Sequence, residues 1–186
     1  RLDVFRQMGD ALTGRFFKHR LMPFSVKEIK LIGQDISFNE LLEKGGFPEP
    51  ILAESLDDVN RWRQGYLDSI ISEDVLGFQN IGQLNTMKML IKLLQRRVGS
   101  PVSYSSLARD LNTSVGTIKR YIEILESLFI IFRVSPYSKN IARSILKDAK
   151  IYFYDWGMVI GDDAIKYENM VATSLLKHCF ALTDYK

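Results

Sequence analysis

Apolar residues recur every three or four positions along much of this chain, a spacing that places them on one face of an α-helix. The pattern is clearest over residues 82–98. Serine caps and glycine or proline stops set the approximate ends of other helices. The predicted helices start after Ser25 and cover residues 37–44, 56–76, 82–98, 103–111, 115–130 and 164–180.

Three short runs of β-branched or aromatic residues predict strands, and they lie at 15–24, 131–134 and 151–154. A lone strand is not stable by itself. The first run is therefore expected to join a sheet formed by residues upstream of Arg1. The predicted fold class is mainly α, with a small sheet after residue 130 and short strands near both ends of the chain.

Residues 101–136 have the most specific local pattern, because they combine two capped helices, a tight turn and a strand. Ser103 is predicted to cap the first helix and Ser114 the second, since a serine hydroxyl satisfies an otherwise unpaired helical N–H. The turn lies at 112–114, and the polar, basic residues 135–150 follow as a loop or wing. This order resembles a winged helix-turn-helix, a fold that docks on DNA or on protein.

The second helix of this segment offers side chains of the kind that contact a DNA duplex. Threonine, lysine and arginine bind phosphates and base edges, whereas Glu123 and Glu126 on the same helix would repel a phosphate backbone. A solvated helix face of mixed charge is the alternative interpretation. The residues predicted to face double-stranded DNA are Ser114, Thr117, Lys119, Arg120, Arg133, Lys139 and Arg143.

Charge is distributed unevenly, although the formal net charge is only +3. Residues 31–76 contain ten acidic and three basic side chains, whereas residues 100–150 contain eight basic and four acidic ones. A basic module beside an acidic one is typical of a DNA-binding surface, and equally of two modules that dock on each other. The charge pattern therefore leaves both DNA and protein partners open.

Motifs for catalysis and metal binding are missing from the sequence, which has no GxxxxGK[ST] phosphate loop, no HExxH and no GxSxG. Two histidines and one cysteine are too scattered to suggest a metal site. Cys179 is expected to be buried beside an exposed His178, because adjacent helical residues point in different directions. The last predicted helix is expected to bury Met170, Val171, Ser174, Leu175 and Cys179.

The composition and the two ends bound the environment of the protein. A single cysteine excludes an intramolecular disulfide and fits a reducing cytoplasm. No apolar run is long enough to span a bilayer, and the start has no signal-peptide pattern. The chain begins at Arg1 without an initiator methionine and ends at Lys186 directly after a helical pattern. We therefore expect a cytoplasmic piece of a longer protein, with no membrane partner.

Several short motifs follow one another along essentially the whole chain. They are Leu12-Thr13-Gly14-Arg15, Pro23-Phe24-Ser25 with Glu28, Gly45-Gly46-Phe47-Pro48-Glu49, Tyr66 with Asp74, Lys150-Ile151-Tyr152-Phe153-Tyr154-Asp155 with Gly157, and Glu168-Asn169 with Val171. Their order resembles the C-terminal part of a family of uncharacterised prokaryotic AAA-type P-loop ATPases. In that family an ATPase core precedes a domain that combines a winged helix with a restriction-endonuclease-like module.

The resemblance implies a division of the chain into four parts. Residues 1–30 would end the ATPase core with its last strand and following helix, and residues 31–99 would form a helical lid-like region. Residues 100–150 would form the winged helix, and residues 151–186 the truncated start of the nuclease-like module. The nucleotide loop would lie upstream of Arg1, so ATP and Mg²⁺ are implied for the parent protein and no cofactor for this fragment.

The same resemblance assigns roles to a few side chains. Arg15 matches an arginine that ends the ATPase core, where a guanidinium senses nucleotide phosphate or forms a structural ion pair. The Gly45–Glu49 motif is expected to be a structural turn. Asp155 and Glu168 match acidic positions of the nuclease-like module. They are expected to act as caps or ion pairs, with divalent-metal binding as the alternative.

Three functional hypotheses follow. In the first, the chain has no catalytic centre and couples the nucleotide state of the upstream ATPase to a partner through the winged helix. In the second, it is a DNA-binding regulatory module. In the third, it begins a degenerate or truncated nuclease. The first hypothesis is preferred and the second is the alternative. The expected partners are the upstream ATPase chain and double-stranded DNA or a protein, and the pattern is compatible with a homo-oligomer.

Overall fold

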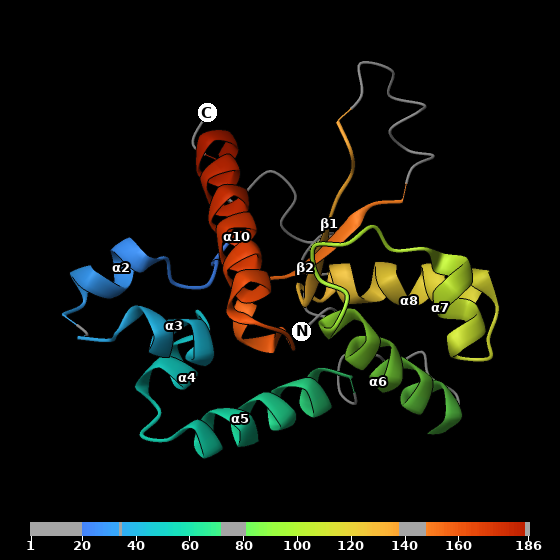
Figure 1. Ribbon diagram of the computed structural model, residues 1–186, viewed down its shortest axis with the longest axis horizontal. Helices are drawn as coiled ribbons and strands as arrows, with labels where there is room; N and C mark the ends of the chain where they lie inside the picture. The colour runs from blue at the N-terminus through green and yellow to red at the C-terminus, as the bar shows by residue number, and fades with distance from the viewer. Residues whose placement is uncertain (1–19, 34, 72–80, 138–147, 185–186) are drawn as a thin grey trace, which may run out of the picture.

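The computed structural model describes residues 20–33, 35–71, 81–137 and 148–184 of the 186-residue chain. In the first half, four helices follow one another with short connections, and Figure 1 shows them along one side and the lower edge of the molecule. They are α2 (Val26–Leu31), α3 (Phe38–Lys44), α4 (Pro48–Leu52) and α5 (Leu56–Ser69). Serine caps begin three of them, at Ser25, Ser37 and Ser55.

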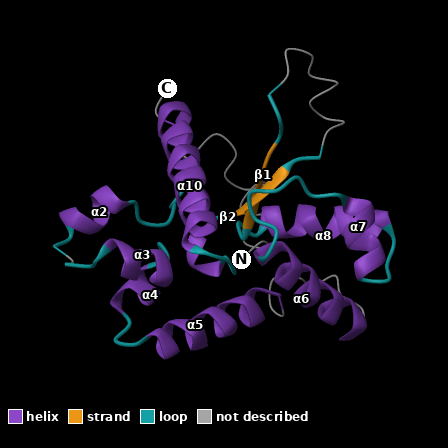
Figure 2. Cartoon of the chain, in the orientation of Figure 1, coloured by secondary structure: helices purple, strands orange, loops and turns teal. Residues whose placement is uncertain are grey.

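In the described part of the second half, three more helices lie before and beside a small sheet, and a long helix follows. The helices are α6 (Ile81–Gln95), α7 (Tyr104–Asp110) and α8 (Val115–Ser127), followed by strands β1 (Ile131–Val134) and β2 (Lys150–Phe153). A 3-10 turn, η2 (Trp156–Met158), then leads into α10 (Asp163–Asp184). The described residues are therefore mainly helical with one small sheet, as the sequence predicts (Figure 2).

The sheet is an antiparallel pair in which Ile131 lies opposite Phe153 and Val134 lies opposite Lys150. Helix α8 leads directly into β1, and α7 packs against α8. On the other side, α10 contacts β2, η2 and α3, so it lies between the sheet and the N-terminal helices (Figure 1). This helix, turn, helix and strand order agrees with the prediction for residues 101–136, whereas the pairing of β1 with β2 was not predicted. The assignment as a winged helix stays a prediction.

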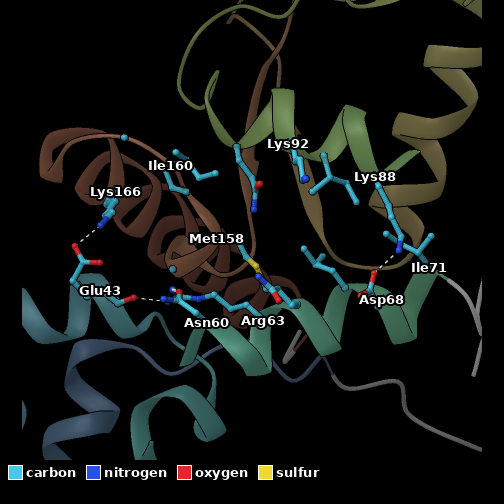
Figure 3. Close-up of a pocket in the computed structure, with 17 residues that line it drawn as sticks. Glu43, Asn60, Arg63, Asp68, Ile71, Lys88, Lys92, Met158, Ile160 and Lys166 are labelled. Atoms are coloured by element: carbon cyan, nitrogen blue, oxygen red, sulfur yellow. Dashed lines mark hydrogen bonds and ion pairs between the residues drawn. The ribbon is translucent and has the colours of Figure 1, made fainter. Parts of the chain in front are cut away.

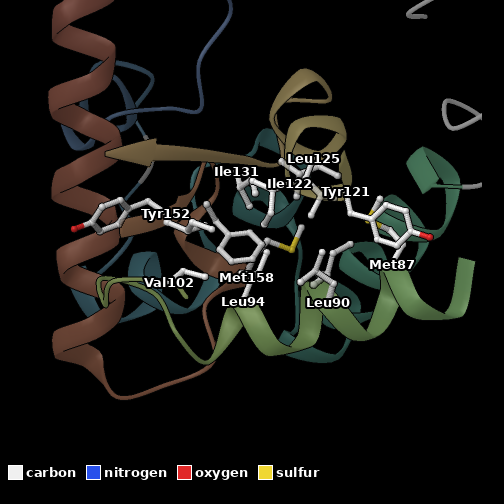
Figure 4. Packing of buried hydrophobic residues seen from close by; sticks show 14 of the residues in the cluster. Met87, Leu90, Leu94, Val102, Tyr121, Ile122, Leu125, Ile131, Tyr152 and Met158 are labelled. Atoms are coloured by element: carbon white, nitrogen blue, oxygen red, sulfur yellow. The ribbon is translucent and has the colours of Figure 1, made fainter. Parts of the chain in front are cut away.

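Two hydrophobic clusters form the core among the described residues. The larger one joins the inner faces of α6 and α8 to the sheet, with Leu90, Ile122 and Ile131 fully buried (Figure 4). The smaller one lies among the N-terminal helices and is formed by Ile29, Leu41, Leu42, Ile51, Trp156 and Met170. Trp156 and Met170 belong to the C-terminal half. The second core therefore exists only because chain segments more than 100 residues apart come together.

Helix α10 is attached to the sheet by polar side chains. Asn169 is fully buried, and its amide accepts from the Phe153 N–H at 2.8 Å and donates to the Phe153 carbonyl at 2.7 Å. The Thr173 hydroxyl donates to the same carbonyl at 3.1 Å. Asn169 thus supplies the two hydrogen bonds that a neighbouring strand would supply to β2.

This attachment corrects the predicted buried face of the last helix. Met170 is buried as expected, but Val171, Ser174, Leu175 and Cys179 are exposed, and Leu175 retains 61% of its accessible surface. The hydrogen bonds to Phe153 fix the rotation of α10, so Asn169 and Thr173 face inward instead. The expectation of a buried Cys179 thiol was therefore wrong.

Element ends differ from the prediction in a few other places. Helix α8 ends at Ser127 rather than near 130, because Phe129 adopts a φ of +56° and the Ile130 N–H turns back to the Leu125 carbonyl. Helix α4 was not predicted. The first half of the predicted strand over 15–24 lies outside the described residues, and residues 20–24, which are described, form no strand. In the described residues, no helix is both long and apolar enough to cross a membrane.

The Asn169 attachment gives a testable stability prediction. Replacing Asn169 with leucine leaves the Phe153 N–H buried without a partner, and we expect a loss of about 2–3 kcal/mol in the free energy of unfolding. The control Thr173→Val loses less, roughly 1 kcal/mol, because the Phe153 carbonyl keeps its bond from Asn169. Chemical denaturation measures both values, and equal losses in the two variants would contradict this account.

Candidate functional site

The outer face of α8 carries most of the described residues that were predicted to face DNA. The Ser114 hydroxyl caps the helix by accepting from the Thr117 N–H at 3.0 Å, and the two hydroxyls bond to each other at 2.9 Å. Lys119 and Arg120 follow on the exposed face, and neither forms an ion pair with another described residue. Glu123 is also exposed one turn further on. The face is therefore basic at its start and mixed in charge beyond it.

Arg133 is engaged within the fold. Its guanidinium forms an ion pair with Glu126 at 2.6 Å and donates to the Tyr104 hydroxyl at 3.0 Å. The hydrogen bond to Glu126 is the main reason that the pKa of Arg133 lies above its usual value. This pair joins α7, α8 and β1. It also neutralises Glu126, one of the two acidic residues expected to oppose a phosphate backbone.

Three of the predicted site residues cannot be placed in this way. Arg15, Lys139 and Arg143 lie outside the described residues. Their suggested contacts with nucleotide or DNA therefore stay predictions.

Asp155 is the most deeply buried ionisable side chain of the predicted site residues, with 2% of its surface exposed. Its Oδ1 accepts from the Gly46 N–H at 2.8 Å and from the Gly157 N–H at 3.3 Å. The second contact caps η2, and the first reaches across 109 residues to the turn after α3. The adjacent Trp156 makes a parallel link, since its indole Nε1 donates to the Leu41 carbonyl at 3.0 Å. We call Gly45, Gly46, Asp155, Trp156 and Gly157 the Asp155 junction.

Glycines are required on both sides of this junction. Gly45 ends α3 with a φ of +82°, and a Cβ there would lie 2.2 Å from the Asp155 Oδ1 atom. A Cβ on Gly46 would lie 2.6 Å from the Trp156 ring. Gly45, Gly46 and Phe47 thus form a structural turn, whereas Pro48 and Glu49 of the predicted turn already belong to α4. The lack of side chains on the two glycines permits the close approach of Asp155 and Trp156.

Arg63, on α5, completes the electrostatics of the junction. Its guanidinium donates to the Glu43 carbonyl oxygen and packs so closely on Gly157 that a Cβ there would clash with it. Burial lowers the pKa of Arg63, while the charges of Asp155 and Glu43 act in the opposite direction. Burial also raises the pKa of Asp155, against the effects of the Gly46 N–H, Arg63 and the Gly157 N–H.

Asp155 and Arg63 each keep one side-chain atom that forms no hydrogen bond. The Asp155 Oδ2 and the Arg63 Nε atoms are buried without a hydrogen-bond partner in the structure. A buried carboxylate oxygen without a donor destabilises the ionised form, which agrees with the raised pKa of Asp155.

Glu168 lies at a different place, on α10 beside the sheet. It accepts from the Tyr152 hydroxyl at 2.8 Å and pairs with Lys150 at 3.2 Å. Burial, together with the bond to Glu168, raises the pKa of Tyr152 to about 12. A Cβ at Gly99 would lie 2.8 Å from the Glu168 carboxylate. Glu168 is therefore in an ion pair and Asp155 is a cap, which are the structural roles considered for them.

The metal alternative receives no support from this placement. Among the residues that the structure describes, no three histidine, cysteine, aspartate or glutamate side chains form a group that could hold a metal ion. The sequence did not identify Arg63 as part of this site. Its position in a polar helical pattern gives no sign that its side chain reaches Gly157. Only indirect evidence of this site is present in the sequence, in the form of two turns that contain glycine, at 45–46 and 155–157.

The burial of Asp155 in the junction leads to a prediction of how stability depends on pH. Asp155→Ala leaves the buried Gly46 N–H unpaired, and we expect it to reduce the free energy of unfolding by about 3 kcal/mol at pH 7. Asp155→Asn keeps an acceptor for that N–H and should lose less. Because the pKa is raised on folding, the carboxyl favours folding most below its unfolded pKa of about 3.9.

The wild-type advantage over Asp155→Asn should therefore shrink as the pH rises from about 4 through the pKa in the folded state. Denaturation curves of both proteins across this range measure the difference. An advantage that grows with pH would mean that the folded state holds Asp155 as a stabilised carboxylate, contrary to this account.

Comparison with known proteins places the chain among relatives of unknown activity. It is 26% identical over 157 residues to an uncharacterised protein of Mycobacterium tuberculosis. The alignment covers 84% of this chain and 35% of the relative. An uncharacterised protein of Haemophilus influenzae is 26% identical over 197 residues, covering 95% and 49%. One of Methanocaldococcus jannaschii is 23% identical over 200 residues, covering 94% and 45%.

The chain thus spans less than half the length of these curated relatives. No solved structure matches it significantly. Residues 35–164, more than half of the chain, match the model of one family, described as Domain of unknown function (DUF8612). That segment contains the Asp155 junction, α7, α8 and both strands. The chain therefore belongs to the DUF8612 family.

Proposed function

We propose that this chain is a non-catalytic part of a longer prokaryotic AAA-type ATP-binding protein, in which it couples nucleotide state to a partner. In this proposal the N-terminal helices contact the upstream ATPase core, and the helix-turn-helix of α7 and α8 binds the partner. The observation that carries it is the Asp155 junction. Its hydrogen bonds join the turn after α3 to the segment that follows the sheet, so movement of one is transmitted to the other.

The arrangement of rigid elements supports this view. Helix α10 contacts α3, η2 and β2, and β1 continues from α8, so the N-terminal helices connect to the helix-turn-helix through packed contacts. Coupling between sites needs such a connected element whose position both sites influence. The relatives are longer than this chain, which leaves room for the proposed ATPase core.

The coupling proposal is tested on the longer parent protein by hydrogen exchange. Exchange of backbone amides in α7 and α8 should differ between a non-hydrolysable ATP analogue and ADP. Asp155→Ala leaves the Gly46 N–H unpaired and should reduce that difference, whereas the exposed control Asp163→Ala should preserve it. Identical exchange with both nucleotides, or a full response in Asp155→Ala, would rule out coupling through this junction.

DNA binding is the second candidate function, and one observation favours it. Lys119 and Arg120 lie in the first half of α8, exposed and without an ion-pair partner among the described residues. The start of the second helix is where helix-turn-helix proteins contact base edges and phosphates. Neutralisation of Glu126 by Arg133 also removes part of the repulsion that a duplex would meet on this face.

A salt series on duplex DNA tests this second candidate. If Lys119 and Arg120 each contact a phosphate, the double variant Lys119→Glu, Arg120→Glu should bind more weakly at low salt. Its slope of log affinity against log salt should also be shallower by about 2. The control protein carries Lys27→Glu and Arg61→Glu, which reverse two exposed charges outside α8. A double variant that binds like wild type, or a wild type that binds no duplex at low salt, would eliminate this function.

A further inference from the structure

A cavity of about 760 Å³ lies between α5, α6 and the segment 157–161. Figure 3 shows α6 above it and α5 below it, with the loop after η2 closing one side. The Ile160 N–H bonds to the Gln95 carbonyl at 3.0 Å, which ties that loop to the end of α6. A volume in this range is typical of small-molecule sites. The cavity is separate from the outer face of α8.

The walls of the cavity combine an apolar floor with polar edges. Apolar side chains come from all three elements, and amide side chains lie among them. The apolar lining residues are Leu67, Ile71, Ile91, Met158, Val159 and Ile160. The amides are Asn60, Gln64 and Gln95. Such a lining suits a ligand that has an apolar body and one polar head.

Positive charge exceeds negative charge around this cavity. Among the described lining residues, Arg63, Lys88, Lys92 and Lys166 are cationic, whereas only Glu43 and Asp68 are acidic. Lys88 is paired with Asp68 at 2.6 Å, and Lys166 is paired with Glu43. These two pairs use both carboxylates.

Lys92 is therefore left with no acidic partner among the described residues. Figure 3 shows its side chain on the face of α6 that lines the cavity. On the opposite wall, the Arg63 Nη1 group contacts only the Asn60 side-chain oxygen among the described residues, at 3.5 Å, and so keeps donor capacity toward the cavity. Two cationic side chains on facing helices, each with unused donor capacity, form a site for an anion.

We propose that this cavity binds a small organic anion, with a phosphate or carboxylate head held by Lys92 and Arg63 and an apolar body packed on the wall formed by Leu67, Ile91 and Met158. The ligand would join α5 to α6 and to the segment that continues from the Asp155 junction. This inference is independent of the coupling and DNA-binding proposals, since it uses neither the α8 face nor an upstream ATPase.

Calorimetry on the intact chain tests the site with four probes: phenyl phosphate, phenylacetate, inorganic phosphate and benzyl alcohol. The site requires head and body together, so at least one aromatic anion should bind more tightly than both inorganic phosphate and benzyl alcohol. Tighter binding of phenyl phosphate assigns the head to phosphates, and tighter or equal binding of phenylacetate assigns it to carboxylates. Binding of an aromatic anion no tighter than benzyl alcohol would overturn the proposal.

Variants locate the binding. Lys92→Gln removes one charge-assisted hydrogen bond from an exposed position and should weaken binding of the aromatic anion roughly tenfold. Lys27→Gln makes the same change at an exposed position on α2, outside the cavity, and should leave that affinity unchanged. Equal affinities in wild type and Lys92→Gln would overturn the site.

Discussion

The fold depends on one buried carboxyl group. Asp155 brings the turn after α3 against the turn after β2, and the smaller core cluster assembles around Trp156 beside it. A buried carboxyl group is unfavourable without donors, and here two backbone N–H groups bond Oδ1 and the Arg63 charge lies nearby, while Oδ2 has no hydrogen-bond partner. Gly46, Arg63 and Gly157 belong to three separate segments, so these favourable interactions form only when all three are in place.

The glycines of the junction follow from the same constraint. Asp155 and Trp156 approach the backbone at 45–46 so closely that any side chain there would occupy their space. On the far side of the segment, Asn169 holds β2 to α10 through the backbone of Phe153. Residues 153–157 are thus fixed on both flanks, and the cavity between α5 and α6 opens directly beyond them. The same segment therefore belongs to the Asp155 junction and borders the candidate ligand site.

The sequence predicted the local elements well because their determinants are local. Ser25, Ser103 and Ser114 each cap the helix that their position indicates, and the apolar periodicity of α6 and α8 defines the larger core. The inward face of α10 was misjudged because its rotation is set by hydrogen bonds from Asn169 and Thr173 to a distant strand. Hydrophobicity alone favoured Val171 and Leu175, which are exposed.

The candidate sites show the same limit. The exposure of Lys119 and Arg120 could be read from helical periodicity, since they alternate with Ile118, Tyr121 and Ile122. The engagement of Arg133 by Glu126 required knowledge of how β1 returns along α8. The cavity could not be predicted at all, because Arg63, Lys92 and Met158 meet only through tertiary packing.

Native-state hydrogen exchange tests the role of the Asp155 junction most directly. The amides of Gly46, Phe153 and Gly157 are followed one by one in the intact wild-type chain over a range of low denaturant concentrations. If the junction is the tie between the two halves, the three amides should open in the same event, with one common free energy. Opening of Gly46 in a separate event of lower free energy, while Phe153 and Gly157 stay protected, would contradict this account.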